Sequence, residues 1–153
     1  MPTITPFLWY DDQAEQAAER YVALFPDSRI DSVSRTPDGR TLVVEFTLLG
    51  SPYRAMNGGP GHEHTDAVSF QVDVDDQQEL DRIWDGLLAD GGRPSRCGWL
   101  FDRWGVAWQV TPSMMGDMMT GSGDPAANAR VFETMLQMEK LDIAALQAAA
   151  AGR

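Results

Sequence analysis

Few side chains in this sequence could act as a nucleophile, a general base or a metal ligand. Both histidines, His62 and His64, flank Glu63 in a loop rich in glycine and proline. On a strand this spacing would place both rings on one face, but on a loop it sets no geometry. Three interpretations of the two histidines therefore remain: they are exposed loop residues, they gate access to a ligand, or they bind an ion. The sequence supports no nucleophilic triad.

Cys97 is the only cysteine, which excludes an intrachain disulfide and a multi-cysteine zinc site. Because it precedes Gly98, it could be an exposed thiolate nucleophile, and the alternative is a small buried residue of a strand. Trp99 and Trp108 fall on neighbouring predicted strands. They are candidates to line a ligand groove, with packing in the core as the alternative.

Composition excludes several classes of partner. The chain has 153 residues, of which 23 are acidic and 12 basic, giving a formal net charge of −11. This charge repels phosphate backbones and anionic lipid headgroups, so we expect no nucleic-acid and no membrane partner. The N-terminus lacks the basic region and cleavage site of a signal peptide, which predicts a cytoplasmic protein. The single lysine, Lys140, lies in a helical, glycine-free context, so no P-loop is present.

Apolar periodicity in the first third predicts the order βαβββ. Residues 4–10 form an apolar, aromatic strand, followed by a helix that Asp12 caps, with Glu15 completing the capping box, and that Pro26 ends. Three extended runs follow, separated by the turn sequences Pro37-Asp38-Gly39 and Leu49-Gly50. They cover residues 29–35, 41–48 and 52–57.

The second third begins in the same way. The pattern Asp-Asp-Gln-x-Glu occurs at residues 11–15 and again at 75–79, each time directly after a predicted strand, which indicates an internal repeat of about 64 residues. We expect a strand at 67–72, a helix capped by Asp76, and strands at 95–102 and 106–111, with one strand lost or irregular. The predicted class is α+β, with paired βαβββ modules at residues 3–61 and 62–112 in a single domain, 1–153.

The last third, residues 113–153, is predicted to be a helical extension. Asp124 and Pro125 are typical of a helix start, with the helix reaching about Met138, and Asp142 is expected to cap a final helix. Its apolar residues must pack on the sheet or on a second subunit, and this surface predicts a homodimer. They include Phe132, Met135, Leu136, Leu141 and Leu146.

Several motifs together resemble the vicinal oxygen chelate superfamily (glyoxalase I, bleomycin resistance proteins and extradiol dioxygenases), and more closely its PhnB-like branch, labelled "3-demethylubiquinone-9 3-methyltransferase domain". The resemblance covers residues 3–112 and implies the paired βαβββ fold. It rests on residues 4–9 (ITPFLW), Phe25-Pro26, 57–60 (NGGP), Ser69-Phe70, 97–100 (CGWL), Asp102, Gly105, 108–110 (WQV) and Pro112. Nothing resembles the glycine-rich loop of a Rossmann-like S-adenosylmethionine site.

The superfamily's enzymes hold a divalent ion with His and Glu side chains on their strands, and this chain lacks that set. Where relatives often place a His it has Ala67, and where they often place a Glu it has Gln109. A neutral amide cannot hold a cation without charged neighbours, so we expect no metal and no cofactor. The resemblance makes six residues candidates for substrate binding, with a structural role as the alternative: Asn57, Ser69, Gln71, Trp99, Trp108 and Gln109.

The resulting prediction is a metal-free, small-molecule-binding homodimer of unknown substrate. The alternative is a metal-dependent enzyme of the glyoxalase/dioxygenase superfamily, such as an isomerase, lyase or thiol transferase. A structural or regulatory domain without a ligand is a third reading. Whether the protein is an enzyme is left open by the sequence.

Overall fold

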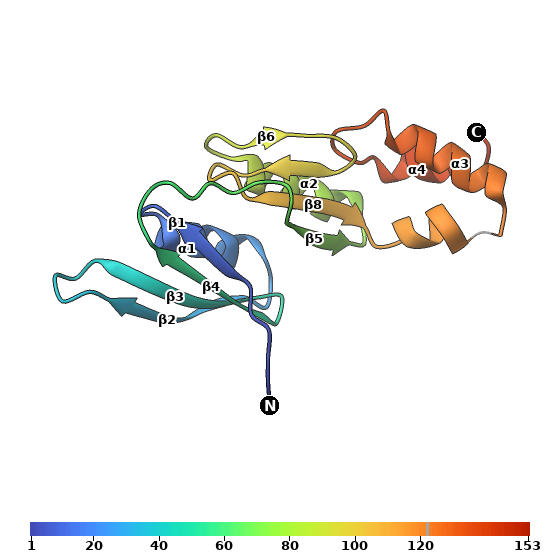
Figure 1. Cartoon of the computed structure of the whole chain (residues 1–153). Coiled ribbons are helices and arrows are strands. Elements are labelled where there is room, and N and C mark those ends of the chain that lie inside the picture. Colours follow the sequence, from blue (N-terminus) through green and yellow to red (C-terminus); the bar gives the residue numbers. More distant parts are fainter. Residues whose placement is uncertain (122) are drawn as a thin grey trace. The chain divides into compact units, whose positions relative to one another are not determined.

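The computed structural model describes residues 1–121 and 123–153, which form two compact units, Met1–Glu63 and His64–Arg153. Each unit holds a four-stranded mixed sheet and a helix in the order βαβββ, and the second unit carries further helices (Figure 1). The predicted α+β class and the paired βαβββ modules are therefore confirmed. No helix among the described residues has the length and apolar character needed to cross a membrane.

The first unit is a sheet with helix α1 on one face. Its strands run in the order β1-β4-β3-β2, with β1 parallel to β4 and the other pairs antiparallel. Small residues on α1 allow close packing, and the hydroxyl groups of Tyr10 and Tyr21 lie 3.1 Å apart in the core. The elements are β1 (Phe7–Tyr10), α1 (Ala14–Leu24), β2 (Arg29–Arg35), β3 (Thr41–Leu48) and β4 (Ser51–Asn57).

The second unit repeats this plan with helix α2. The strand order is β5-β8-β7-β6, and β5 pairs in parallel with β8. The buried face of α2 carries Leu80, Ile83, Trp84 and Leu87, as the spacing predicts. The elements are β5 (Ser69–Val74), α2 (Gln77–Leu88), β6 (Arg93–Pro94), β7 (Trp99–Phe101) and β8 (Ala107–Pro112), followed by η1 (Asp117–Gly121), α3 (Pro125–Met135) and α4 (Ile143–Ala150).

The strand that the sequence left uncertain is the two-residue β6. The prediction of one strand over 95–102 is wrong because a tight turn interrupts it. The amide of Ser95 donates to the carbonyl of Trp99 (2.9 Å), and Cys97 and Gly98 both have positive φ, at 58° and 84°. A Cβ on Gly98 would lie 2.9 Å from Leu141 Cδ1, so glycine is needed here for space as well as conformation.

Three of the four helix caps predicted from the sequence are present in the structure. Asp76, Asp124 and Asp142 accept hydrogen bonds from the first-turn amides of α2, α3 and α4, as predicted. The prediction that Asp12 caps α1 is wrong. The amide of Ala14 donates instead to Asn57 Oδ1, 2.8 Å away at the end of β4.

The C-terminal extension packs on its own unit. Gln77 of α2 donates to the carbonyl of Leu141 (3.1 Å) and accepts from the amide of Ile143 (2.9 Å). Leu141, which lies beside Gly98, and Leu146 are buried, whereas Phe132 of α3 and its C-cap Leu136 are 45% and 43% exposed. The second unit therefore covers part of the apolar surface of the extension, and Phe132 and Leu136 remain exposed.

Candidate functional site

Four of the predicted site residues share one face of the second sheet. Gln71 of β5 is in register with Gln109 of β8, which is in register with Trp99 of β7, so the three side chains form a row across neighbouring strands. Ser69 lies two residues before Gln71 on the same face. We call Ser69, Gln71, Trp99 and Gln109 the open sheet face, because the opposite face packs on α2.

Hydrogen bonds fix both amides of the open sheet face. Gln109 Nε2 donates to Ser69 Oγ at 2.9 Å, and Gln71 Nε2 donates to Asp73 Oδ1 at 2.9 Å. Within residues 1–121 and 123–153 neither side-chain carbonyl oxygen of these glutamines has a hydrogen-bond partner. The face thus presents two oriented neutral acceptors beside an indole, which suits hydrogen bonding to a small polar ligand.

Trp108 lies on the other side of the sheet. It directly precedes Gln109 on β8, so the two side chains point to opposite faces, and Trp108 is only 2% exposed. Its Nε1 donates to Asp102 Oδ2 at 3.0 Å, while Asp102 Oδ1 accepts from the amides of Trp104 and Val106. Trp108 therefore holds the turn before β8 in place and does not join the open sheet face.

Asn57 belongs to the first unit, and its amide is used within the fold. Besides accepting from the amide of Ala14, it donates through Nδ2 to the carbonyl of Thr41 at 3.2 Å. It therefore joins the start of α1, the start of β3 and the end of β4. These hydrogen bonds are the structural role that the sequence analysis gave as the alternative for Asn57, but its partners could not be named because they are distant in the chain.

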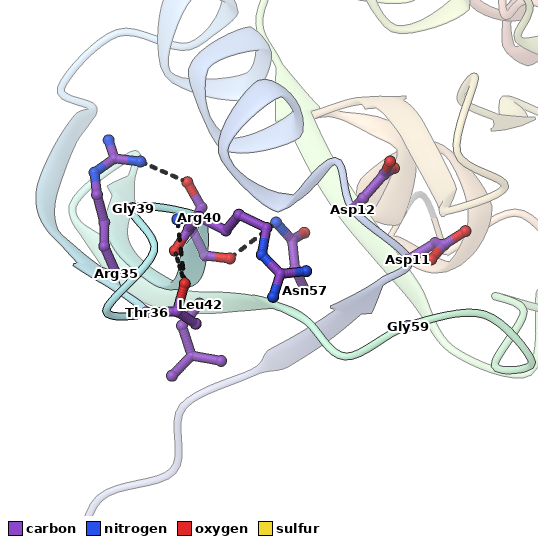
Figure 2. A pocket seen from close by; sticks show the side chains of 10 residues that line it. Asp11, Asp12, Arg35, Thr36, Gly39, Arg40, Leu42, Asn57 and Gly59 are labelled. Carbon is purple, nitrogen blue, oxygen red and sulfur yellow. Dashed lines mark hydrogen bonds between the residues drawn. The ribbon is translucent and has the colours of Figure 1, made fainter.

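Asn57 also lines a pocket of about 630 Å³ in the first unit. Figure 2 shows Asp11 and Asp12 on one side of Asn57 and the β2–β3 hairpin, with Arg35 and Arg40, on the other. The lining residues are Asp11, Asp12, Arg35, Thr36, Gly39, Arg40, Thr41, Leu42, Asn57 and Gly59. Sequence reasoning missed this pocket, although the turn sequence between the two arginines predicts that they flank a hairpin.

One charged group beside the pocket is already neutralised. Arg35 donates to both carboxylate oxygens of Glu15, at 3.0 and 3.2 Å, and to Thr41 Oγ1 at 2.9 Å. The hydrogen bond from Thr41, and after it the guanidinium of Arg35, lower the pKa of Glu15 below its ordinary value. This cluster fixes the hairpin against α1.

The two histidines fall on either side of the boundary between the units. The ring of His62, in the first unit, lies 4.5 Å from that of Trp9, and His64 begins the second unit. Trp9 Nε1 donates to the carbonyl of Gly59 at 2.8 Å, and a Cβ on Gly58 would lie 2.1 Å from the indole, so the glycines allow the loop to wrap around Trp9.

The remaining metal and nucleophile candidates give no assembled site. Cys97 is half-buried in the β6–β7 turn, where its amide donates to the carbonyl of Met138 at 2.8 Å. Across the described ranges, no group of three or more His, Cys, Asp or Glu side chains is gathered in a way that could hold a metal ion.

The order and pairing of the elements in the two units define a glyoxalase-like fold. The family model described as 3-demethylubiquinone-9 3-methyltransferase matches residues 2–111, so the chain belongs to this PhnB-like family. The PhnB protein of Bacillus cereus, which carries the same methyltransferase description, is 30% identical, with 73% of this chain and all of that chain aligned and a TM-score of 0.68.

More distant structures share the fold alone. Protein PA1353 of Pseudomonas aeruginosa is 20% identical over 73% of this chain and 98% of its own, with a TM-score of 0.57. A glyoxalase/bleomycin resistance protein of Albidiferax ferrireducens T118 is 12% identical over 71% and 95%, with a TM-score of 0.50. A comparison with the curated proteins finds no match.

Proposed function

We propose that the chain is a small-molecule-binding protein that works without a bound metal ion, and that the open sheet face contacts the ligand. The observation that carries this proposal is the row of Gln71, Gln109 and Trp99 across three neighbouring strands. A row of oriented neutral acceptors beside an aromatic ring provides hydrogen bonds and apolar contact, the two components of most small-molecule sites.

The absence of charged ligands on this row supports a metal-free site. Gln109 is held by Ser69, and its neutral oxygen contributes far less to cation binding than a carboxylate would. Asp73 lies two residues after Gln71 on the same face of β5, and one of its carboxylate oxygens already accepts from Gln71. The family's description as a methyltransferase finds no support in the sequence, which lacks a nucleotide-binding glycine loop.

Metal analysis tests the proposal. The protein is grown with Zn²⁺, Mn²⁺, Ni²⁺ and Fe²⁺ and desalted, and the bound metal is then measured. We expect far less than one equivalent per chain, and one equivalent would contradict the metal-free site and favour a metal-dependent enzyme. A thermal-shift screen across metabolites and cationic glycopeptide antibiotics is expected to give a hit whose stabilisation is lost in Gln71→Ala and Gln109→Ala but kept in Gln137→Ala, a control on the C-terminal extension.

A homodimer is part of the proposal. The exposed Phe132 on α3 and Leu136 at its C-cap offer apolar surface for a second copy. We expect light scattering to give about 34 kDa, twice the 16.9 kDa of one chain. Phe132→Asp should shift the mass to that of one chain if this surface forms the dimer. A monomeric wild-type protein at every concentration tested would contradict the dimer.

A further inference from the structure

A second row of residues crosses the sheet of the second unit on the same side as the open sheet face. Ser69 of β5 is in register with Ala107 of β8, and Ala107 with Phe101 of β7. Phe101 is in turn in register with Arg93 of the edge strand β6 (Figure 1). Residues in register on neighbouring strands point to the same side of a sheet. The row therefore brings one charged side chain, Arg93, to the side that carries the proposed ligand surface.

The guanidinium of Arg93 lies over the ring of Phe101. Its central carbon is 3.9 Å from the centre of the ring, within the range of a cation–π contact, and Phe101 is only 9% exposed. The contact uses the flat face of the guanidinium, so the N–H groups around its edge remain able to donate. The buried ring thus gives the charge a defined position, although Arg93 itself is exposed.

No acidic side chain among residues 1–121 and 123–153 neutralises Arg93, which makes no hydrogen bond or ion pair there through its guanidinium. In this chain of net charge −11, other basic side chains do have a carboxylate within 3.0 Å, namely Arg29, Arg35, Arg40, Arg54, Arg82 and Lys140. Arg103 also lies over an aromatic ring, that of Trp104, but in the β7–β8 turn, outside the row. Arg93 therefore places an unneutralised positive charge beside the open sheet face.

One small molecule can reach both Arg93 and the open sheet face. Gln109 is the diagonal neighbour of Phe101 on the antiparallel strands β8 and β7, and such neighbours lie about 7–8 Å apart. Trp99 adjoins both, since it is opposite Gln109 and two residues before Phe101. A ligand of that length would meet a cation at one end, the side-chain oxygen of Gln109 at the other and an indole along its side.

Asp73 determines which way an anionic ligand would lie. It follows Gln71 by two residues on β5, and β5 and β6 are the two opposite edges of this sheet. The carboxylate of Asp73 and the guanidinium of Arg93 therefore stand at opposite edges of the same side. A negative group is repelled from the β5 edge and attracted to the β6 edge.

From these features, and resting on the proposed ligand role of the open sheet face, we propose that the ligand is a small organic carboxylate with an apolar body and a hydroxyl group at its other end. The carboxylate accepts hydrogen bonds from Arg93, the body lies against Trp99, and the hydroxyl group donates to the side-chain oxygen of Gln109. A guanidinium fork matches the two oxygens of a carboxylate. A single guanidinium balances one negative charge, and the net charge of −11 disfavours a dianion such as a phosphate monoester.

Three probes of similar shape test the proposal by NMR titration of the ¹⁵N-labelled full chain at neutral pH. The compound 4-(hydroxymethyl)benzoate has the carboxylate, a flat apolar ring and the hydroxyl group. Its amide, 4-(hydroxymethyl)benzamide, lacks the charge, and 4-methylbenzoate lacks the hydroxyl group. We expect 4-(hydroxymethyl)benzoate to bind at least about tenfold more tightly than the amide, the factor that about 1.4 kcal/mol produces, and also more tightly than 4-methylbenzoate. Its shifts should fall on residues 69–71, 93–101 and 107–109.

Variants assign the two ends of the ligand. Arg93→Gln should weaken both benzoates about tenfold and leave the amide unchanged. Arg93→Lys should keep part of the affinity, because lysine retains the charge but not the planar fork. Gln109→Ala should weaken the two hydroxymethyl compounds and leave 4-methylbenzoate unchanged. Arg82→Gln is the matched control, because it removes the same charge from α2, on the opposite side of the sheet.

The outcomes separate this inference from the proposed function. Equal binding of the acid and its amide, or an Arg93→Gln variant that binds as the wild-type protein does, would overturn the inference. If the shifts still fell on the open sheet face, the proposed function would stand. Shifts elsewhere that Gln71→Ala and Gln109→Ala leave unchanged would contradict both. No saturable binding of 4-(hydroxymethyl)benzoate would also overturn the inference, whereas the thermal-shift screen tests the proposed function independently.

Discussion

Replacing Asn57 by alanine should destabilise the first unit, because its amide makes two hydrogen bonds that the fold has no other means to supply. The amide of Ala14 would lose its acceptor at the start of α1, which typically costs about 0.5–2 kcal/mol. The carbonyl of Thr41 would lose a donor, which costs about 1 kcal/mol more. We therefore expect a loss of about 1.5–3 kcal/mol in the free energy of unfolding.

Two further variants isolate the cause. Asn57→Asp keeps an oxygen for the amide of Ala14 but loses the donor to Thr41, so it should recover the helix-start contribution and cost about 1 kcal/mol. Gln71→Ala is the control variant, because Gln71 is, like Asn57, one of the six residues that the sequence made candidates for substrate binding. Its exposed side chain bonds only to Asp73 among the described residues, and its loss should cost about 0.5 kcal/mol or less.

Urea denaturation followed by tryptophan fluorescence gives the free energies, and hydrogen exchange at the Ala14 amide reports on the helix start directly. We expect Ala14 to lose protection in Asn57→Ala and to keep it in Asn57→Asp. An alanine variant as stable as the wild-type protein, or unchanged protection of Ala14, would refute the reasoning. So would a larger loss in Gln71→Ala than in Asn57→Ala.

Three other variants have clear expected outcomes. Gly58→Ala should cost about 1–3 kcal/mol in urea denaturation, because its Cβ would lie 2.1 Å from the Trp9 ring, and a smaller cost in a Trp9→Ala background would identify the clash. The pKa of Glu15 is lowered in the folded state, so the charged carboxylate stabilises the fold above its unfolded-state pKa of 4.5, and this stabilisation is lost as the pH falls through the folded-state pKa. The difference in unfolding free energy between the wild-type protein and Glu15→Gln should therefore shrink on acidification. A difference that stays constant with pH would contradict this. Gln109→Glu should cost less than about 1 kcal/mol, because its side chain is only half-buried and the Ser69 hydroxyl can donate to the new carboxylate; a larger loss at pH 8 that is recovered at pH 5 would show that it lies in the core.

Most of the fold could be predicted because the signals are local. The expected strands at 29–35 and 41–48 match the bounds of β2 and β3, since the turn sequence between them sets the hairpin. The cap residues Asp76, Asp124 and Asp142 also act within three residues of their own position. The strand expected at 67–72 begins two residues later, at Ser69, because the amide of Ala67 bonds to Thr65 Oγ1 before pairing starts.

The candidate site was harder to predict because it depends on which face each residue takes. Trp108 and Gln109 are neighbours on β8, so the two-residue period of a strand prevents both from lining one face. That period predicts from the sequence that the two side chains point to opposite faces. It does not say which residue points toward the helix, because this depends on the hydrogen bond between the Trp108 indole and Asp102. Ser69, Gln71 and Gln109 meet through the parallel pairing of β5 with β8, whose register the sequence does not reveal.

The repeated Asp-Asp-Gln-x-Glu pattern explains why a repeat in sequence need not repeat a function. In the second unit Asp76 caps its helix and Glu79 binds Arg82 on the same helix. In the first unit Asn57 supplies the hydrogen bond at the helix start, and Glu15 reaches across to the hairpin that carries Arg35. One long-range hydrogen bond therefore changes the role of the motif: where Asn57 binds the helix start, the aspartates before the helix are no longer needed there and line a pocket. The consequence for interpreting such repeats is that a capping motif identifies the start of a helix, whereas a residue that meets the helix from a distant strand determines whether the aspartates of the motif cap it.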